Sequence, residues 1–163
     1  MKTLTSHFKI SAIISAILLV LVSADYSRAN QNGVGLGVII GEPTGPTFKF
    51  WTGRSTAIDG ALAWSFDRNN ELHLQMNYLF HEFGAINVNK GRMPFYYGIG
   101  GRLKFHDDNR DDEFGVRVPA GLSYLFANSP VELFFEVVPI VNLAPDTELD
   151  FNGGIGIRYY LGK

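Results

Sequence analysis

Polar and apolar residues alternate along most of the chain after residue 33. The stretch Glu71–Tyr78 reads Glu-Leu-His-Leu-Gln-Met-Asn-Tyr, a strict alternation. Successive side chains of a β-strand point to opposite faces, so this period predicts strands with one polar and one apolar face. Segments rich in Gly, Pro, Asn, Asp and Ser separate the alternating stretches and favour turns. The pattern predicts eight strands, at 34–41, 46–52, 56–66, 70–81, 94–106, 113–126, 131–143 and 148–162.

The length of these strands and the order of their aromatic residues favour a membrane over a soluble core. Several strands reach the ~9–11 residues that a tilted strand needs to cross a bilayer. When the strands run alternately up and down, the aromatic residues of the apolar face form two girdles around an aliphatic middle, as in membrane barrels. The expected girdles are Trp64, Phe66, Phe105, Phe114 and Phe151 at one rim, and Tyr78, Phe80, Phe95, Tyr97, Tyr124, Phe126 and Tyr159 at the other.

The opposite face of the predicted strands carries charges of both signs, which can pair with one another. A ring of eight strands is only wide enough for side chains to fill it. We therefore predict an all-β, eight-stranded antiparallel up-and-down transmembrane barrel with a packed polar interior, and not an open pore. Glycines on the same face, such as Gly121 and Gly156, are expected to make room for long Arg and Lys side chains. The expected interior network is Lys49, Asp59, Glu71, His73, Arg102, Lys104, Arg117, Glu132, Glu136, Asp150 and Arg158.

Residues 1–29 have the features of a secretory signal peptide. Lys2 and Lys9 precede an apolar run of 13 residues, Ile10–Val22, and two small-residue cleavage patterns follow, Val22-Ser23-Ala24 and Ser27-Arg28-Ala29. The run is shorter than the ~20 apolar residues of a membrane-spanning helix. We therefore expect residues 1–29 to be cleaved and residues 30–163 to form one barrel domain.

Composition excludes several classes of partner. Three of the 14 basic and one of the 16 acidic residues precede residue 30, which leaves 11 against 15 and a formal charge of −4. A nucleic-acid partner needs a basic surface, so we expect none. The sequence contains no cysteine, and a disulfide framework or a thiolate metal site is therefore impossible.

Two motifs resemble ligand sites but lack the required context. Gly33-Val-Gly35-Leu-Gly37 precedes no helix whose N-terminus could bind a phosphate. A calcium loop starting at Asp107 would need glycine and glutamate where Asp112 and Val118 stand. We expect no cofactor, no metal site and no catalytic residue. The acidic loop is instead the candidate for contact with a partner: Asp107, Asp108, Asn109, Arg110, Asp111 and Asp112.

The last strand contains Asn152-Gly153-Gly154-Ile155-Gly156-Ile157-Arg158-Tyr159, which is similar to the signal by which assembly machinery recognises bacterial outer-membrane barrels. With its strand count and alternation, the chain resembles the OmpA-transmembrane-domain-like superfamily of small eight-stranded outer-membrane barrels over residues 34–162. It departs from this family by ending on Tyr160-Leu161-Gly162-Lys163 instead of an aromatic residue. The resemblance implies location in the outer membrane, contact with its lipid, and recognition of the C-terminal strand by the barrel-assembly machinery.

Three functions follow as alternatives. The first is a non-enzymatic surface barrel, structural or adhesin-like, that binds a host or surface ligand through its short outer loops. The second is a lipid A-modifying enzyme, for which Ser65 and His106 are the outer-rim candidates, but they lack the oriented base that catalysis needs. The third is a soluble periplasmic lipocalin-like carrier, which would need apolar residues inside and charges outside. We expect the first.

Overall fold

The computed structural model describes residues 33–65, 71–106 and 112–161, and within these ranges the fold is all-β. No helix in this part of the chain is long and apolar enough to span a membrane. The strands are β1 (Val34–Gly41), β2 (Gly45–Trp51), β3 (Thr56–Ser65), β4 (Glu71–Glu82), β5 (Phe95–His106), β6 (Glu113–Arg117), β7 (Ala120–Leu125), β8 (Val131–Ala144) and β9 (Glu148–Leu161).

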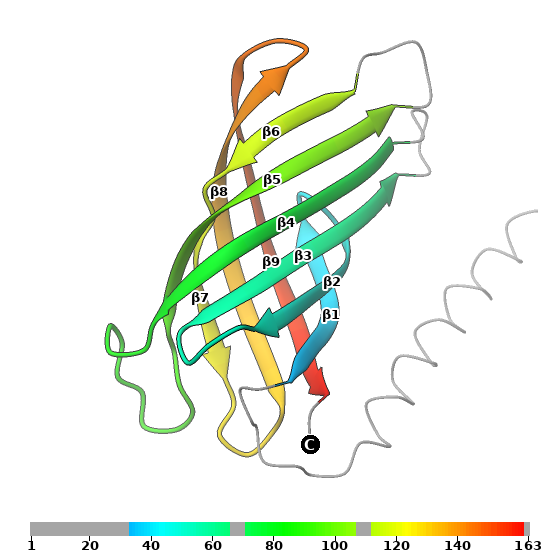
Figure 1. Cartoon of the computed structure of the whole chain (residues 1–163). Coiled ribbons are helices and arrows are strands. Elements are labelled where there is room, and N and C mark those ends of the chain that lie inside the picture. Colours follow the sequence, from blue (N-terminus) through cyan, green and yellow to red (C-terminus); the bar gives the residue numbers. More distant parts are fainter. Residues whose placement is uncertain (1–32, 66–70, 107–111, 162–163) are drawn as a thin grey trace, which may run out of the picture.

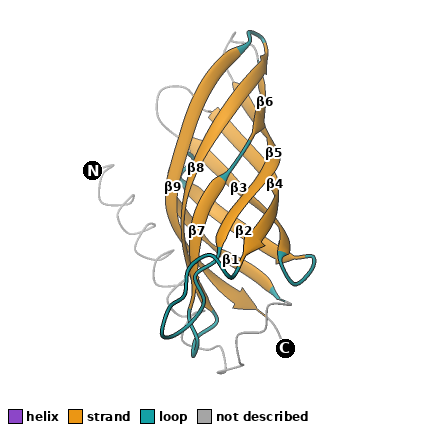
Figure 2. Ribbon diagram, turned by 90° about the vertical axis from the view of Figure 1, so that its left-hand side faces the viewer, coloured by secondary structure: helices purple, strands orange, loops and turns teal. Residues whose placement is uncertain are grey.

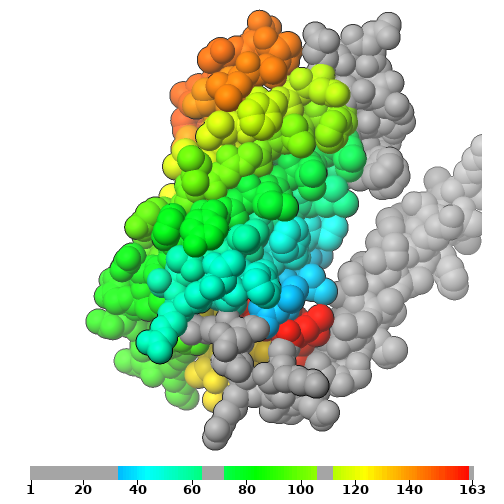
Figure 3. Space-filling model, viewed as in Figure 1, coloured from blue at the N-terminus to red at the C-terminus, as the bar shows by residue number. Residues whose placement is uncertain are grey.

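These strands form a closed antiparallel barrel, as predicted (Figure 1; Figure 2). Strands that follow one another in the chain pair with each other, except that β6 and β7 each pair with β5 and β8. β1 pairs with β9 from Val34↔Leu161 to Gly41↔Gly154, which closes the ring. The end of β9 and the β4–β5 loop lie at one end of the barrel, which we call the proximal end. The β8–β9 turn lies at the other, the distal end, and the β1–β2 turn points the same way but ends lower, opposite the middle of β9. On the face seen in Figure 3, side chains of neighbouring strands form a continuous surface.

One predicted strand, 113–126, is divided into β6 and β7. The interruption falls at Val118-Pro119, because proline has no backbone N–H for the hydrogen-bond ladder. The register against β5 is unchanged across the gap: Arg117 pairs with Gly100, and Ala120 pairs with Tyr97. The two strands therefore occupy one position of the ring, and the eight-strand barrel is retained.

The alternation along the strands separates a charged interior from an apolar exterior. Lys49 and Glu132 are fully buried, whereas Ile99 and Met76 keep 58% and 54% of their surface exposed. This arrangement confirms the predicted barrel with a packed polar interior. It is the reverse of the apolar interior that a lipocalin-like carrier needs, so that alternative is not retained.

The segment between β4 and β5, for which the sequence suggests no structure, folds back along β7. Arg92 and Leu125 exchange two backbone hydrogen bonds of 3.0 and 2.8 Å, which continue the β5–β7 pairing beyond Phe95. The Tyr124 hydroxyl donates to the Lys90 carbonyl at 2.9 Å. These contacts fix the loop beside β7 at the proximal rim of the barrel.

Candidate functional site: the barrel interior and its rims

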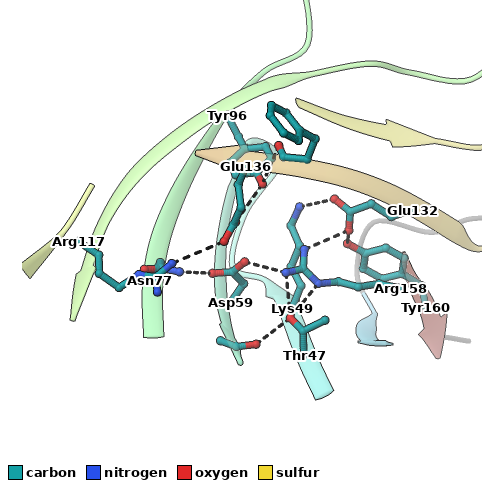
Figure 4. A network of polar contacts seen from close by, with 12 residues as sticks. Thr47, Lys49, Asp59, Asn77, Tyr96, Arg117, Glu132, Glu136, Arg158 and Tyr160 are labelled. Atoms are coloured by element: carbon teal, nitrogen blue, oxygen red, sulfur yellow. Dashed lines mark hydrogen bonds and ion pairs between the residues drawn. The ribbon is translucent and has the colours of Figure 1, made fainter. Parts of the chain in front are cut away.

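The centre of the barrel holds a connected network of buried ion pairs (Figure 4). Lys49 donates from Nζ to Glu132 Oε1 at 2.7 Å, and the Tyr160 hydroxyl donates to Glu132 Oε2 at 2.5 Å. Arg158 lies 2.8 Å from Asp59 and 3.7 Å from Glu132. The two cations and two carboxylates balance in charge, which a buried site requires.

Arg158 makes the most contacts in this network. Its Nε and Nη2 donate to Thr47 Oγ1 at 3.3 and 3.0 Å, and Nη2 also donates to Asp59. The Asn77 amide donates to the second oxygen of Asp59 at 2.9 Å. The guanidinium lies 3.8 Å from the ring centroid of Phe134, within the range of a cation–π contact. Arg158 therefore links β9 to β2 and β3 across the interior.

A second group, towards β6, contains Arg117. Arg117 lies 3.5 Å from Glu136, and the Tyr96 hydroxyl donates to Glu136 at 3.1 Å. Both charged residues are buried. This pair is less tightly made than the Arg158 network, because 3.5 Å is long for a charge-assisted hydrogen bond.

A third group lies near the distal end and is reached by solvent. Arg102 is buried and donates to Asp150 at 3.0 Å and to Asn142 at 2.7 Å, and it lies 3.5 Å from Glu113. Lys104 pairs with Glu113 at 3.3 Å. Glu113 is the charged member of this group that the sequence analysis missed. It shares the strand parity of Gly115 and Arg117, which could have identified it.

The structure therefore brings most of the predicted interior residues together, at three depths. Those that are buried are Lys49, Asp59, Arg102, Arg117, Glu132, Glu136 and Arg158. His73, Lys104 and Asp150 are partly buried nearer the distal end. The side chain of Glu71 lies outside the described part of the chain.

The proximal end of the interior is aromatic and apolar, which the sequence analysis did not predict. Trp51, Leu125 and Tyr160 form a buried cluster with Ala57, and Phe83 of the β4–β5 loop packs against it. The rings of His81 and Phe83 lie 4.5 and 6.1 Å from the ring of Trp51. Lys49 Nζ lies 4.5 Å above the Trp51 ring, so the cluster joins the central network directly. We call Trp51, His81, Phe83, Leu125 and Tyr160 the proximal plug.

Three glycines of the interior face, Gly35, Gly121 and Gly156, lie against aromatic rings and not against long cationic side chains, which corrects our expectation for these positions. A Cβ on Gly121 would lie 2.6 Å from the Tyr96 ring, and one on Gly35 would lie 2.9 Å from the Tyr160 ring. A Cβ on Gly156 would overlap the Phe134 ring. Because aromatic rings are wide and rigid, the position on a neighbouring strand where such a ring crosses the interior must be a glycine.

The described girdle residues lie on the outer surface. Near the proximal end they touch one another: ring centroids are 5.2 Å apart for Tyr78 and Phe80, 5.7 Å for Phe80 and Tyr97, and 4.8 Å for Tyr124 and Phe126. Phe95 is exposed and Tyr159 is partly exposed at the same level, and Phe105, Phe114 and Phe151 are exposed towards the distal end. The side chain of Trp64, and Phe66 altogether, lie outside the described residues.

The candidate chemical sites at the distal rim remain predictions. Residues 107–111 of the acidic loop, and the side chains of Ser65 and His106, are outside the described part of the chain. Asp112, the last residue of that loop, is exposed. Within the described residues, no group of three or more His, Asp or Glu side chains is arranged to hold a metal ion.

The fold and the interior together define a small closed β-barrel that is filled by its own side chains. No protein-family model matches the chain, and no curated protein matches it. Among solved structures, the barrel is similar to the N-terminal β-barrel domain of Pseudomonas aeruginosa OprF, with a TM-score of 0.57 and 13% sequence identity over 80% of this chain and 98% of that chain. At this identity the likeness concerns the fold alone, and it confirms the small antiparallel barrel that the strand pattern predicts.

Proposed function

We propose that the protein is a non-enzymatic β-barrel of a bacterial outer membrane, exported by a cleaved signal peptide at residues 1–29. The observation that carries this proposal is the continuous apolar exterior around a charged interior. A soluble protein would leave such a surface in water, whereas a bilayer covers it. The filled interior argues for a structural or surface-interaction role and against an open porin.

Outer-membrane location is tested by fractionation and gel migration. The mature protein is expected in the outer-membrane fraction, and it is expected to migrate differently when unheated and when boiled, because a closed barrel resists detergent. A variant truncated before Glu148 lacks the strand that closes the ring and is the matched control, expected to show no shift. Recovery of the full-length protein in the soluble fraction would refute the proposal.

The distal end is proposed to face the cell exterior, with the proximal end in the periplasm. A short epitope tag inserted after Asp146, in the β8–β9 turn, should be detected by antibody on intact cells. The same tag inserted after Gly84, in the proximal loop, should be detected only after the outer membrane is permeabilised. The opposite pattern would mean that the barrel has the opposite orientation in the membrane. The loop between β4 and β5 would then face the cell exterior and become the candidate for the surface role.

The surface role is proposed to reside in the distal loops, including the acidic loop at residues 107–112. Deleting this loop should reduce binding of cells to host or surface ligands, whereas deleting residues 85–90 at the proximal end should not. Equal binding by cells with the intact protein and by cells with either deletion would leave a purely structural role. Lipid A should have the same mass spectrum with and without the protein, and a changed spectrum would contradict a non-enzymatic function.

A further inference from the structure

The hairpin formed by β1 and β2 is shorter than the strands on either side of it, and this leaves part of one edge of β9 unpaired. β9 pairs with β8 over residues 148–159, whereas its pairing with β1 ends at Gly154. β3 likewise pairs with β4 as far as Ser65, but its pairing with β2 ends at Ala61. Within the described residues, no strand occupies the ring positions of β1 and β2 on the distal side of their turn (Figure 1). We call residues 149–152 of β9 the open edge.

The turn between β1 and β2 explains why the hairpin stops here. Thr44 Oγ1 accepts from the Gly41 N–H at 3.0 Å and donates to the Gly41 carbonyl at 2.8 Å, so the chain reverses in a compact turn. The Glu42 N–H donates to the Gly153 carbonyl at 2.9 Å, which extends the ladder to β9 by one bond. Pro43 follows, and it has no N–H with which to continue that ladder.

Backbone groups of the open edge point towards the ring position of β1. Alternate residues of an antiparallel strand bond to the same neighbour. Because Gly153 bonds on the β1 side, Phe151 and Leu149 present their N–H and C=O groups on that side too. The Phe151 N–H donates to Asp150 Oδ1 at 2.8 Å. The Phe151 carbonyl and both backbone groups of Leu149 have no ladder partner among the described strands, so they form an edge that another strand can pair with.

The side chains of the open edge are divided between the two faces of the barrel wall. On the outer face, Leu149 and Phe151 are 65% and 61% exposed. On the inner face, Asn152 is 4% exposed, and its amide oxygen and nitrogen have no hydrogen-bond partner among the described residues. A strand beside β9 would place a side chain opposite Asn152, with the two Cβ atoms about 4.5–5.5 Å apart. The amide is therefore available to a polar side chain of such a strand.

Charge selects the side chains that suit this position. Glu148 and Glu42 are exposed at the two ends of the open edge, and the side chain of Asp150 between them is 39% exposed. Arg102 pairs with Asp150 at 3.0 Å, which leaves the edge with an excess of negative charge. Basic side chains on the inner face of an added strand would complement it.

We propose that the open edge binds an extended segment of another protein, in which apolar residues alternate with Lys or Arg. The segment runs antiparallel to β9 in the ring position of β1, and main-chain hydrogen bonds to Leu149 and Phe151 hold it. Its basic side chains lie beside Asn152 and the acidic residues, and its apolar side chains continue the outer face. This inference rests on the proposed surface role of the distal end, and it adds the position and the chemistry of the partner.

The first test uses the purified mature barrel in uncharged detergent micelles and a fluorescent hexapeptide of alternating lysine and valine. Binding is followed by fluorescence anisotropy. Leu149→Pro removes the N–H that faces the added strand and no bond to β8, a change that an edge strand tolerates. Leu149→Ala shortens the same side chain but keeps the N–H, and it is the matched control. Heat-dependent gel migration identifies the folded fraction of each variant.

Two N-methylated peptides test the same hydrogen bonds on the unaltered protein, and they carry the test if Leu149→Pro does not fold. In an antiparallel pair, the valines lie opposite Leu149 and Phe151, so their N–H groups face β9. The N–H groups of the lysines face away from β9. Methylation of the valine nitrogens should therefore weaken binding at least about tenfold more than methylation of the lysine nitrogens.

We expect the lysine–valine peptide to bind the parent barrel saturably. Leu149→Pro should lower its affinity about tenfold, because a peptide carbonyl loses its donor, and Leu149→Ala should stay within about twofold of the parent. No saturable binding by the folded parent barrel would overturn the site. Equal affinities of Leu149→Pro and Leu149→Ala, or of the two methylated peptides, would overturn strand pairing.

Two further results would overturn the choice of partner. Tighter binding of a glutamate–valine peptide would contradict the basic residues. A parent barrel that is a dimer in micelles, with Leu149→Pro a monomer, would make the occupant a second copy of this chain. Peptide binding in micelles does not depend on where the protein resides in the cell, so failure of this inference is distinguishable from failure of the fractionation test.

Discussion

Replacing Arg158 by methionine is the most direct test of what holds the barrel interior together. Methionine keeps much of the side-chain volume but removes the charge and all five donors. The change leaves Asp59 and Glu132 buried with one cation fewer between them. Asp59 then keeps only its bond to the Asn77 amide, and Glu132 keeps Lys49 and Tyr160.

The magnitude follows from the contacts that are lost. A hydrogen bond to a charged group, such as the 2.8 Å bond to Asp59, contributes about 1.5–3 kcal/mol. The desolvated cation–π contact with Phe134 contributes about 2 kcal/mol. Removing one partner of a buried pair costs about 3–5 kcal/mol in total, because the remaining charge is stranded. We expect the free energy of unfolding to fall by an amount in that range.

The assay is urea unfolding of the barrel in phospholipid vesicles, followed by the fraction that migrates as folded protein on unheated gels. Asp59→Asn is measured alone and together with Arg158→Met, which gives a double-mutant cycle. The double variant removes one charge of each sign. Its free energy of unfolding should therefore fall by less than the sum of the decreases in the two single variants. Arg102→Met is the comparison at the distal end. Its free energy of unfolding should fall by less than that of Arg158→Met, because the partners Asp150 and Glu113 remain in contact with water.

Two results would refute this reasoning. If Arg158→Met unfolds within about 1 kcal/mol of the parent protein, the buried network is not a net source of stability. If the losses from Arg158→Met and Asp59→Asn simply add, the two residues are not energetically coupled despite their contact. In either case, the stability of the barrel would have to come from its backbone ladder and its apolar outer surface.

Two further substitutions test the packing and the exterior by the same urea titration. Gly156→Ala would push a methyl group into the Phe134 ring and should cost about 1–3 kcal/mol, whereas Gly84→Ala, with nothing within 4 Å, should change stability by less than about 0.5 kcal/mol. Met76→Arg, at the middle of the exterior of β4, should cost about 2–4 kcal/mol, and Leu143→Arg near the distal rim less than about 1 kcal/mol. Similar losses for Met76→Arg and Leu143→Arg would contradict a membrane around the barrel.

The strand pattern could be predicted from the sequence because a period of two determines which face each residue occupies. Lys49 and Phe50 show this on β2, where one is fully buried and its neighbour is exposed. The interruption at Pro119 could also be anticipated from proline chemistry, but strand parity is the same on both sides of it, so the pattern conceals the break. Strand parity therefore predicts which face of the sheet a residue occupies, but it does not predict whether the hydrogen-bond ladder is continuous.

The contents of the interior could be predicted only in part. Parity alone assigns Trp51, Tyr96 and Tyr160 to the inward face, yet aromatic residues on a polar face look like exceptions until their neighbours are known. Their neighbours come from strands far apart in sequence, as when Tyr160 of β9 meets Glu132 of β8 and Trp51 of β2. The position of the loop at the proximal end could not be predicted either, since it depends on the bridge between Arg92 and Leu125 and on the hydrogen bond from Tyr124 to Lys90.

Pairing of β1 with β9 has a consequence for how the protein is made. These are the first and last strands to leave the ribosome, so the ring cannot close while the chain is being synthesised. Until β9 arrives, β1 and the newest strand both present unpaired edges, which can pair with other chains. Contacts between distant parts of a sequence also form slowly. The barrel can therefore close only after β9 has been made, and a chain that stalls before β9 keeps open strand edges that favour aggregation.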